Sequence, residues 1–93
     1  MANPDTVESD GKVHDRIRIR FLNDFLSSVK CAVDEGIPVL GYQHWSIKDN
    51  FEWAEGYGPR FGLIHVDYET QKRTKKDSGY HYAEIIRTNG ETL

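Results

Sequence analysis

Apolar residues recur at spacings of three and four from Asp15 to Glu35. The recurring positions are Ile17, Phe21, Leu22, Phe25, Leu26, Val29, Ala32 and Val33. Because this spacing lines one side of a helix, it predicts an amphipathic helix over about residues 15–35. Asp15 is a suitable N-cap, and Gly36 with Pro38 stops the pattern.

The rest of the chain alternates extended and helical patterns. A short apolar run bounded by glycine predicts a buried strand of a parallel sheet at about 37–45. A long loop at 46–62 and an extended piece at 63–68 follow. A second helix is expected at about 77–88, capped by Asp77 or Ser78 and stopped by Asn89-Gly90. The order helix, strand, loop, extended piece, helix predicts an α/β fold.

The first twelve residues carry almost no apolar side chains. They contain Asn3-Pro4-Asp5 and Glu8-Ser9-Asp10-Gly11, which are typical of turns and solvated chain. We therefore expect residues 1–12 to form a disordered arm and residues 13–93 to form the folded part.

Composition narrows the possible partners. The chain has 12 Lys and Arg against 15 Asp and Glu, a net charge of −3, and no basic cluster, so we expect no nucleic-acid partner. Apolar runs are too short for a membrane span. A lone Cys31 excludes an internal disulfide and fits a cytoplasmic location. The histidines lack ligand-like spacing, so we expect no metal and no cofactor.

The stretch from Trp45 to Phe61 combines aromatic rings with carboxylates. Trp45, Trp53 and neighbouring rings stand beside Asp49, Glu52 and Glu55. Sugars are bound this way, since their C–H faces stack on rings while carboxylates and indole N–H groups hydrogen-bond their hydroxyls. The same residues would equally suit the exposed edge of a core with solvated loop charges. Composition alone leaves both interpretations open.

One long motif points to a family. The residues are Trp45-Ser46-Ile47-Lys48-Asp49-Asn50-Phe51-Glu52-Trp53, then Gly56-Tyr57 and Arg60-Phe61-Gly62, with further matches from Asp10 to Asp15 and from Val66 to Tyr80. This pattern resembles the C-terminal part of the family 1 glycoside hydrolases, the β-glucosidase family. The resemblance implies a partial TIM barrel made of its last βα units.

The resemblance also implies roles for individual residues. Trp45 would stack under the sugar ring, Glu52 and Trp53 would hydrogen-bond its hydroxyls, and Phe61 would line the same pocket. The substrate would be a β-glycoside or a monosaccharide. Four other residues are expected to brace the loop instead of touching sugar: Asp49, Asn50, Tyr57 and Arg60.

The family's catalytic carboxylates have no counterpart in this sequence. The resemblance puts the start of the chain just after the nucleophile motif, and the Asn-Glu-Pro motif of the acid/base is absent. Retaining glycosidases need two such carboxyls about 5–5.5 Å apart. Weak residual hydrolysis could use Glu52 or Glu55 with Asp49 as a makeshift pair. The alternatives are an inactive sugar-binding or structural fragment and one piece of a split enzyme.

A partial barrel leaves strand edges and helix faces without neighbours. Three outcomes follow from this: a marginal, partly disordered monomer, a self-associated oligomer, or association with a complementing barrel chain. The hydrophobic share of 38% is low for a globular domain and fits surfaces that face water in this piece.

Overall fold

The computed structural model describes residues 2–93, and its longest element is the first helix. The helix expected at about 15–35 is α1, Arg16–Asp34. It ends where Gly36 adopts a φ of 89°, a left-handed conformation that glycine tolerates without steric cost. The Gly36 N–H donates to the carbonyl of Val33 at 3.0 Å, which satisfies a free carbonyl of the last turn.

The second helix, α2, spans Asp77–Arg87 and agrees closely with the expected range. Lys76, and not Asp77 or Ser78, occupies its N-cap position. At the other end Asn89 has a φ of 51° and donates to a helix carbonyl, so the predicted Asn89-Gly90 stop is present.

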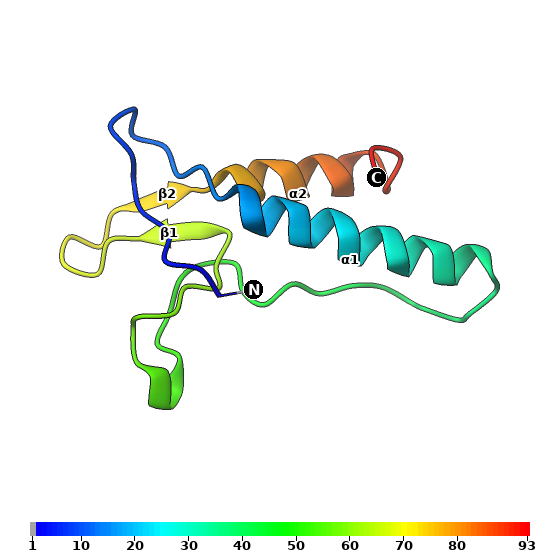
Figure 1. Ribbon diagram of the computed structural model, residues 1–93, viewed down its shortest axis with the longest axis horizontal. Helices are drawn as coiled ribbons and strands as arrows, with labels where there is room; N and C mark the ends of the chain where they lie inside the picture. Colours follow the sequence, from blue (N-terminus) through cyan, green and yellow to red (C-terminus); the bar gives the residue numbers. More distant parts are fainter. Residues whose placement is uncertain (1) are drawn as a thin grey trace.

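The two helices lie side by side with their N-termini at the same end (Figure 1). At that end the Asp15 carboxylate accepts the Ser78 N–H at 2.9 Å. At the other end Lys30 Nζ donates to the carbonyl of Gly90 at 3.0 Å. Asp15 thus stands before α1 but supplies its carboxylate to the first turn of α2. A parallel helix pair is the arrangement that consecutive βα units produce.

The predicted strand at 37–45 is not formed. The segment runs extended back along α1 (Figure 1), but none of its residues pairs with a strand of the described part of the chain. Leu40 in the middle of the segment is fully exposed. An extended segment becomes a strand only when a neighbour accepts its hydrogen bonds, and residues 2–93 contain no such neighbour.

The sheet of the described residues is a two-stranded antiparallel hairpin. Strand β1 spans Ile64–Val66, inside the predicted extended piece, and β2 spans Arg73–Lys75, which the sequence did not predict. Ile64 pairs with Lys75 and Val66 with Arg73. A parallel bridge from Lys48 to Ile64 joins the 46–62 loop to β1.

The hydrophobic core lies between the two helices and the start of β1. Leu22 and Leu26 of α1 pack with Leu63 and Ile85, and each is 7% exposed or less. Three partly buried residues cover this cluster: Tyr42, Tyr82 and Leu93. The molecule measures 47 × 32 × 18 Å, which leaves room for only two layers. Neither described helix is long and apolar enough to cross a membrane.

The N-terminal segment is not a detached arm. Asp5 is buried, and the Asn3 N–H donates to the carbonyl of Arg60 at 3.0 Å. Val13 is buried as well, and its carbonyl accepts the Asp77 N–H at 2.9 Å. The prediction of a disordered arm over residues 1–12 is therefore wrong for this segment, with Met1 lying outside the described residues. Local composition gave no sign of the buried partner of Asp5.

Candidate sugar-binding loop

The tip of the 46–62 loop is a short turn of 3-10 helix, η1, at Trp53–Glu55. The Glu52 N–H donates to the carbonyl of Gly56 at 2.8 Å, and the Gly56 N–H donates to that of Trp53 at 3.0 Å. Trp53 has a φ of 43°, an uncommon conformation for a bulky residue. Outliers of this kind are concentrated at functional sites, which makes the tip a candidate for function.

The four residues predicted to contact sugar lie on two parts of this region. Trp45 ends the extended segment and is 64% exposed, while Trp53 at the loop tip is 81% exposed. Glu52 and Phe61 are half-buried. The Ser46 N–H donates to the carbonyl of Phe61 at 3.3 Å, which holds Phe61 beside the Trp45 end of the segment. Glu52 and Trp53 are adjacent at the tip.

His44 helps to hold Phe61 in place. Its Nδ1 lies 3.1 Å from Tyr42 Oη and its Nε2 lies 3.4 Å from the carbonyl oxygen of Phe61. A carbonyl only accepts, so Nε2 carries the proton and Nδ1 accepts from the tyrosine. Burial lowers the pKa of His44, which favours this neutral form. His44 is thus a packed residue of the scaffold.

Asp49 is the buried centre of the loop. Its Oδ1 accepts the Gly62 N–H at 3.1 Å and Lys76 Nζ at 2.8 Å, and its Oδ2 accepts Arg60 Nη1 at 2.6 Å. Burial opposes ionisation, but the hydrogen bonds from Lys76 and Arg60 outweigh it and the pKa of Asp49 lies below its ordinary value. With no exposed side-chain surface, Asp49 cannot serve as the makeshift acid or base considered from the sequence.

A cluster of aromatic rings supports the same loop. Tyr57 contacts Phe51 and Tyr68, with ring centroids 5.2 and 4.7 Å apart. The Arg60 guanidinium lies 4.6 Å from the centre of the Tyr68 ring, and the Tyr68 hydroxyl donates to the carbonyl of Asn50 at 3.4 Å. The structure therefore agrees with a bracing role for Asp49, Asn50, Tyr57 and Arg60.

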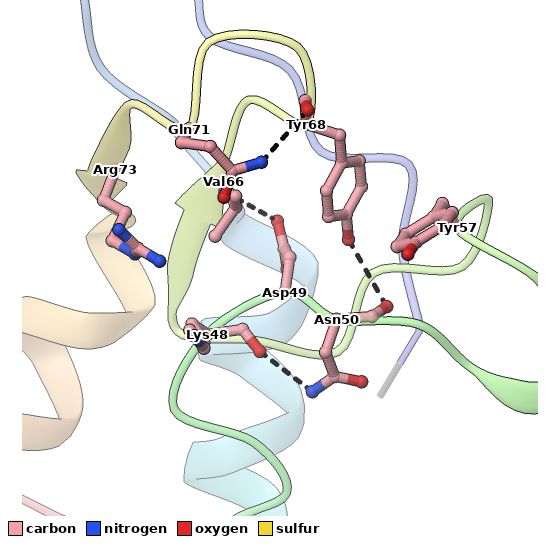
Figure 2. Close-up of a pocket in the computed structure, with 8 residues that line it drawn as sticks. All are labelled: Lys48, Asp49, Asn50, Tyr57, Val66, Tyr68, Gln71 and Arg73. Carbon is pink, nitrogen blue, oxygen red and sulfur yellow. Dashed lines mark hydrogen bonds between the residues drawn. The ribbon is translucent and has the colours of Figure 1, made fainter.

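A cavity of about 360 Å³ opens beside these bracing residues (Figure 2). Its lining consists of Lys48, Asp49, Asn50, Tyr57, Val66, Tyr68, Gln71 and Arg73. Figure 2 shows hydrogen bonds joining the lining residues to one another, from Gln71 to Tyr68 and from Asn50 to Lys48. None of the four predicted sugar-contacting residues lines this cavity. The cavity is therefore distinct from the predicted sugar site.

Sequence reasoning missed Lys76, a distant partner of Asp49, and Asp5, which contacts Lys76 in turn. The sequence gives no role to Lys76, and Asp5 falls within the predicted disordered arm. Both are buried, and Lys76 Nζ contacts Asp5 Oδ2 at 2.5 Å. No local pattern could have shown this contact, because the two residues are 71 positions apart. Among residues 2–93, no group of three or more His, Cys, Asp or Glu side chains is arranged to hold a metal ion.

Comparison with known proteins shows the family to which the chain belongs. The sequence profile of glycosyl hydrolase family 1 matches residues 1–91. The chain belongs to this family, and its helices and hairpin are a small part of a TIM-barrel enzyme.

The chain is similar to β-glucosidases and to a glucan glucohydrolase. Beta-glucosidase A of Thermotoga maritima is 52% identical over 86 residues, which cover 92% of this chain and 19% of that protein. A 1,4-beta-D-glucan glucohydrolase of Thermotoga neapolitana is 53% identical over 95% of this chain and 20% of its own. A solved structure of the Thermotoga maritima β-glucosidase with deoxynojirimycin superposes with a TM-score of 0.94 at 52% identity, over 96% of this chain and 20% of that one. The chain thus spans about a fifth of the length of these relatives.

Proposed function

We propose that this chain supplies one wall of the sugar-binding site of a family 1 β-glycosidase. In this proposal Trp45 stacks on the sugar ring, Glu52 and Trp53 hydrogen-bond its hydroxyls, and Phe61 lines the pocket. The observation that carries the proposal is the display of two large indoles, one 64% exposed just before the 46–62 loop and one 81% exposed at its tip, beside a loop base that is fixed by buried ion pairs. Rings left exposed on a braced support are suited to stacking against a ligand.

The first test is sugar binding by the chain. We expect glucose at high concentration to shift the indole N–H resonances of Trp45 and Trp53 in a nuclear magnetic resonance titration. The Trp53→Ala substitution should weaken or abolish the shift at Trp45. Tyr80→Ala is the matched control, because Tyr80 is a comparably exposed ring (62%) on α2. Equal shifts in both variants would contradict the proposed site.

We further propose that hydrolysis requires the rest of a barrel. A retaining mechanism needs two carboxyls about 5–5.5 Å apart, and the burial of Asp49 leaves Glu52 and Glu55 as the carboxylates of this loop that a sugar could reach. The chain alone should not release nitrophenol from a nitrophenyl β-glucoside. If it does, and if Glu52→Gln or Glu55→Gln abolishes the release, a carboxylate of this loop catalyses hydrolysis without the barrel and this part of the proposal fails.

The proposed complement is the remaining portion of a family 1 barrel, which would cover the 37–47 segment. Among the described residues, positions 37–45 pair with no strand, and Ile37, Leu40 and Ile47 of this segment are exposed. Mixing the chain with the complementary portion of the Thermotoga maritima relative should produce a stable complex with β-glucosidase activity. Leu40→Asp should prevent assembly, while Glu91→Gln, an exposed change on another element, should not. Equal assembly of both variants would show that the segment is not the contact surface.

A further inference from the structure

Six charged side chains are gathered at the end of the molecule where both helices begin. They are Asp5, Asp15, Arg18, Asp49, Arg60 and Lys76, and we call them the charged cluster. Five have side chains no more than 1% exposed, and Arg60 is 17% exposed. Three carboxylates face three cations, so the cluster of these described residues is neutral. Buried charges are tolerated when they are paired in this way.

Asp5 joins two of the cations. Its Oδ2 lies 2.8 Å from Arg18 Nη1 and 2.5 Å from Lys76 Nζ. Lys76 in turn reaches Asp49 Oδ1 at 2.8 Å, so a single ammonium group connects the N-terminal segment to the 46–62 loop. These contacts join three parts of the chain that are far apart in sequence.

The cluster also holds the far end of the loop. Asp49 accepts the Arg60 guanidinium at 2.6 Å and the Gly62 N–H at 3.1 Å. The carbonyl of Arg60 accepts the Asn3 N–H at 3.0 Å and Arg18 Nη2 at 2.8 Å. Both ends of the segment that carries Glu52 and Trp53 are therefore tied to the same buried charges.

We propose that Asp5 and Lys76 are positioning residues for the sugar-contacting loop, although neither belongs to it. This inference rests on the proposed sugar-binding function. Neutralising Asp5 would leave three cations facing two carboxylates, and the uncompensated charge would draw water or counterions into the cluster. The link from Lys76 to Asp49 would loosen, and the loop would lose its fixed geometry. The core around Leu22 lies outside this chain of contacts and would be affected less.

The test compares Asp5→Asn with Asp10→Asn. Asp10 lies on the same segment but is exposed and pairs with His14. Residue-resolved amide hydrogen exchange without sugar is the first readout. We expect exchange of the 46–62 loop to rise about tenfold or more in Asp5→Asn, with a much smaller rise at the centre of α1, because local opening is independent of global unfolding. Asp10→Asn should leave loop exchange unchanged.

A double variant separates positioning from general stability. Asp5→Asn with Lys76→Met removes one charge of each sign, so the cluster stays neutral while the link to Asp49 is lost. We expect α1 protection near that of the original chain and a loop that still exchanges fast. Unchanged loop exchange in Asp5→Asn, an equal rise in loop and core, or a loop restored by the double variant would each overturn the proposal.

Sugar titration of the same variants supplies the second readout. Glucose shifts at Trp45 and Trp53 should be weaker in Asp5→Asn than in Asp10→Asn. If the original chain shows no glucose shift at all, the sugar-binding function fails. The exchange comparison still decides whether Asp5 and Lys76 position the loop, because it is made without sugar.

Discussion

The charged cluster and the 37–47 segment differ in the polarity of their side chains and in how far these side chains are buried. The cluster consists of charged side chains that are buried and paired within the described chain, whereas the segment consists largely of apolar residues, of which Ile37, Leu40 and Ile47 are exposed. Polarity alone would predict the reverse. The difference shows that burial here follows the available partners. Each charge in the cluster contacts an opposite charge, while the exposed apolar residues of the segment have no covering layer within residues 2–93.

The largest effect should come from breaking the cluster. Lys76→Met leaves Asp5 and Asp49 without their shared cation, and removing one partner of a buried ion pair typically costs about 3–5 kcal/mol. Urea unfolding followed by circular dichroism measures the loss. Lys72→Met is the control, because Lys72 is exposed, and it should stay within about 0.5 kcal/mol of the original. A loss below about 1 kcal/mol for Lys76→Met would show that the cluster is not what stabilises this end.

Substitution of two leucines, one buried and one exposed, tests the contrast between the core and the 37–47 segment. Leu22→Ala should lower the free energy of unfolding by about 2–5 kcal/mol, because Leu22 is fully buried between the helices. Leu40→Ala should change it by less than about 0.5 kcal/mol, because Leu40 contributes no buried surface. The same urea experiment measures both. Similar losses would mean that the 37–47 segment is packed in solution.

A smaller effect is expected where the backbone approaches the cluster. A Cβ at Gly62 would lie 2.3 Å from the backbone nitrogen of Asp49, so Gly62→Ala forces the two ends of the loop apart. We expect a loss of about 1–3 kcal/mol, as for other overpacked sites. Gly41→Ala is the matched control, since a Cβ there meets no atom within 4 Å. Equal midpoints in urea for the two variants would contradict this close approach.

The smallest effect is the change of stability with pH. Asp49 contributes to it on the acid side and His14 on the alkaline side. The pKa of Asp49 lies below 3.8, so its stabilising contribution is present above that pH and is lost as the pH falls through the lower folded value. Hydrogen bonds to Asp10 and Asp77 raise the pKa of His14 above 6.5. Its contribution is therefore present below pH 6.5 and is lost as the pH rises.

Midpoints of urea unfolding measured at several pH values test the direction of both contributions. His14→Gln should remove the part of the decline that begins above pH 6.5. In acid it should remove only the contribution of Asp10, whose pKa is lowered by its hydrogen bond to His14, and leave that of Asp49. Asp49→Asn should lower the midpoint near neutral pH and flatten the acid limb. An unchanged alkaline limb in His14→Gln would show that the histidine does not hold the N-terminal segment to α2.

The helices could be predicted from sequence because their signals are local. The spacing of apolar residues located α1, and Gly36 and Asn89 located the two helix ends. The strand at 37–45 could not be settled in the same way. The segment has the apolar pattern of a strand, but a strand forms only beside a neighbouring strand. Local sequence carries no information on whether that neighbour is present.

The residues of the candidate site also differ in whether the sequence could predict their roles. Asp49 and Arg60 were predicted to brace the loop, and the structure shows them paired at its base. The contribution of Asp5 and Lys76 could not be predicted, because a carboxylate in a polar, turn-rich segment looks solvated until its distant cation is known. Ion pairs between distant residues produce no periodic pattern in a sequence.

The placement of Asp15 has a consequence for the order of folding. Its carboxylate completes the first turn of α2 across a separation of 63 residues, so this cap is available only after the chain between the helices has closed into a loop. An isolated peptide of residues 77–88 would lack the cap and should be less helical than α2. Formation of α2 is thereby coupled to the docking of α1, and this contact across 63 residues becomes a late, shared step of folding.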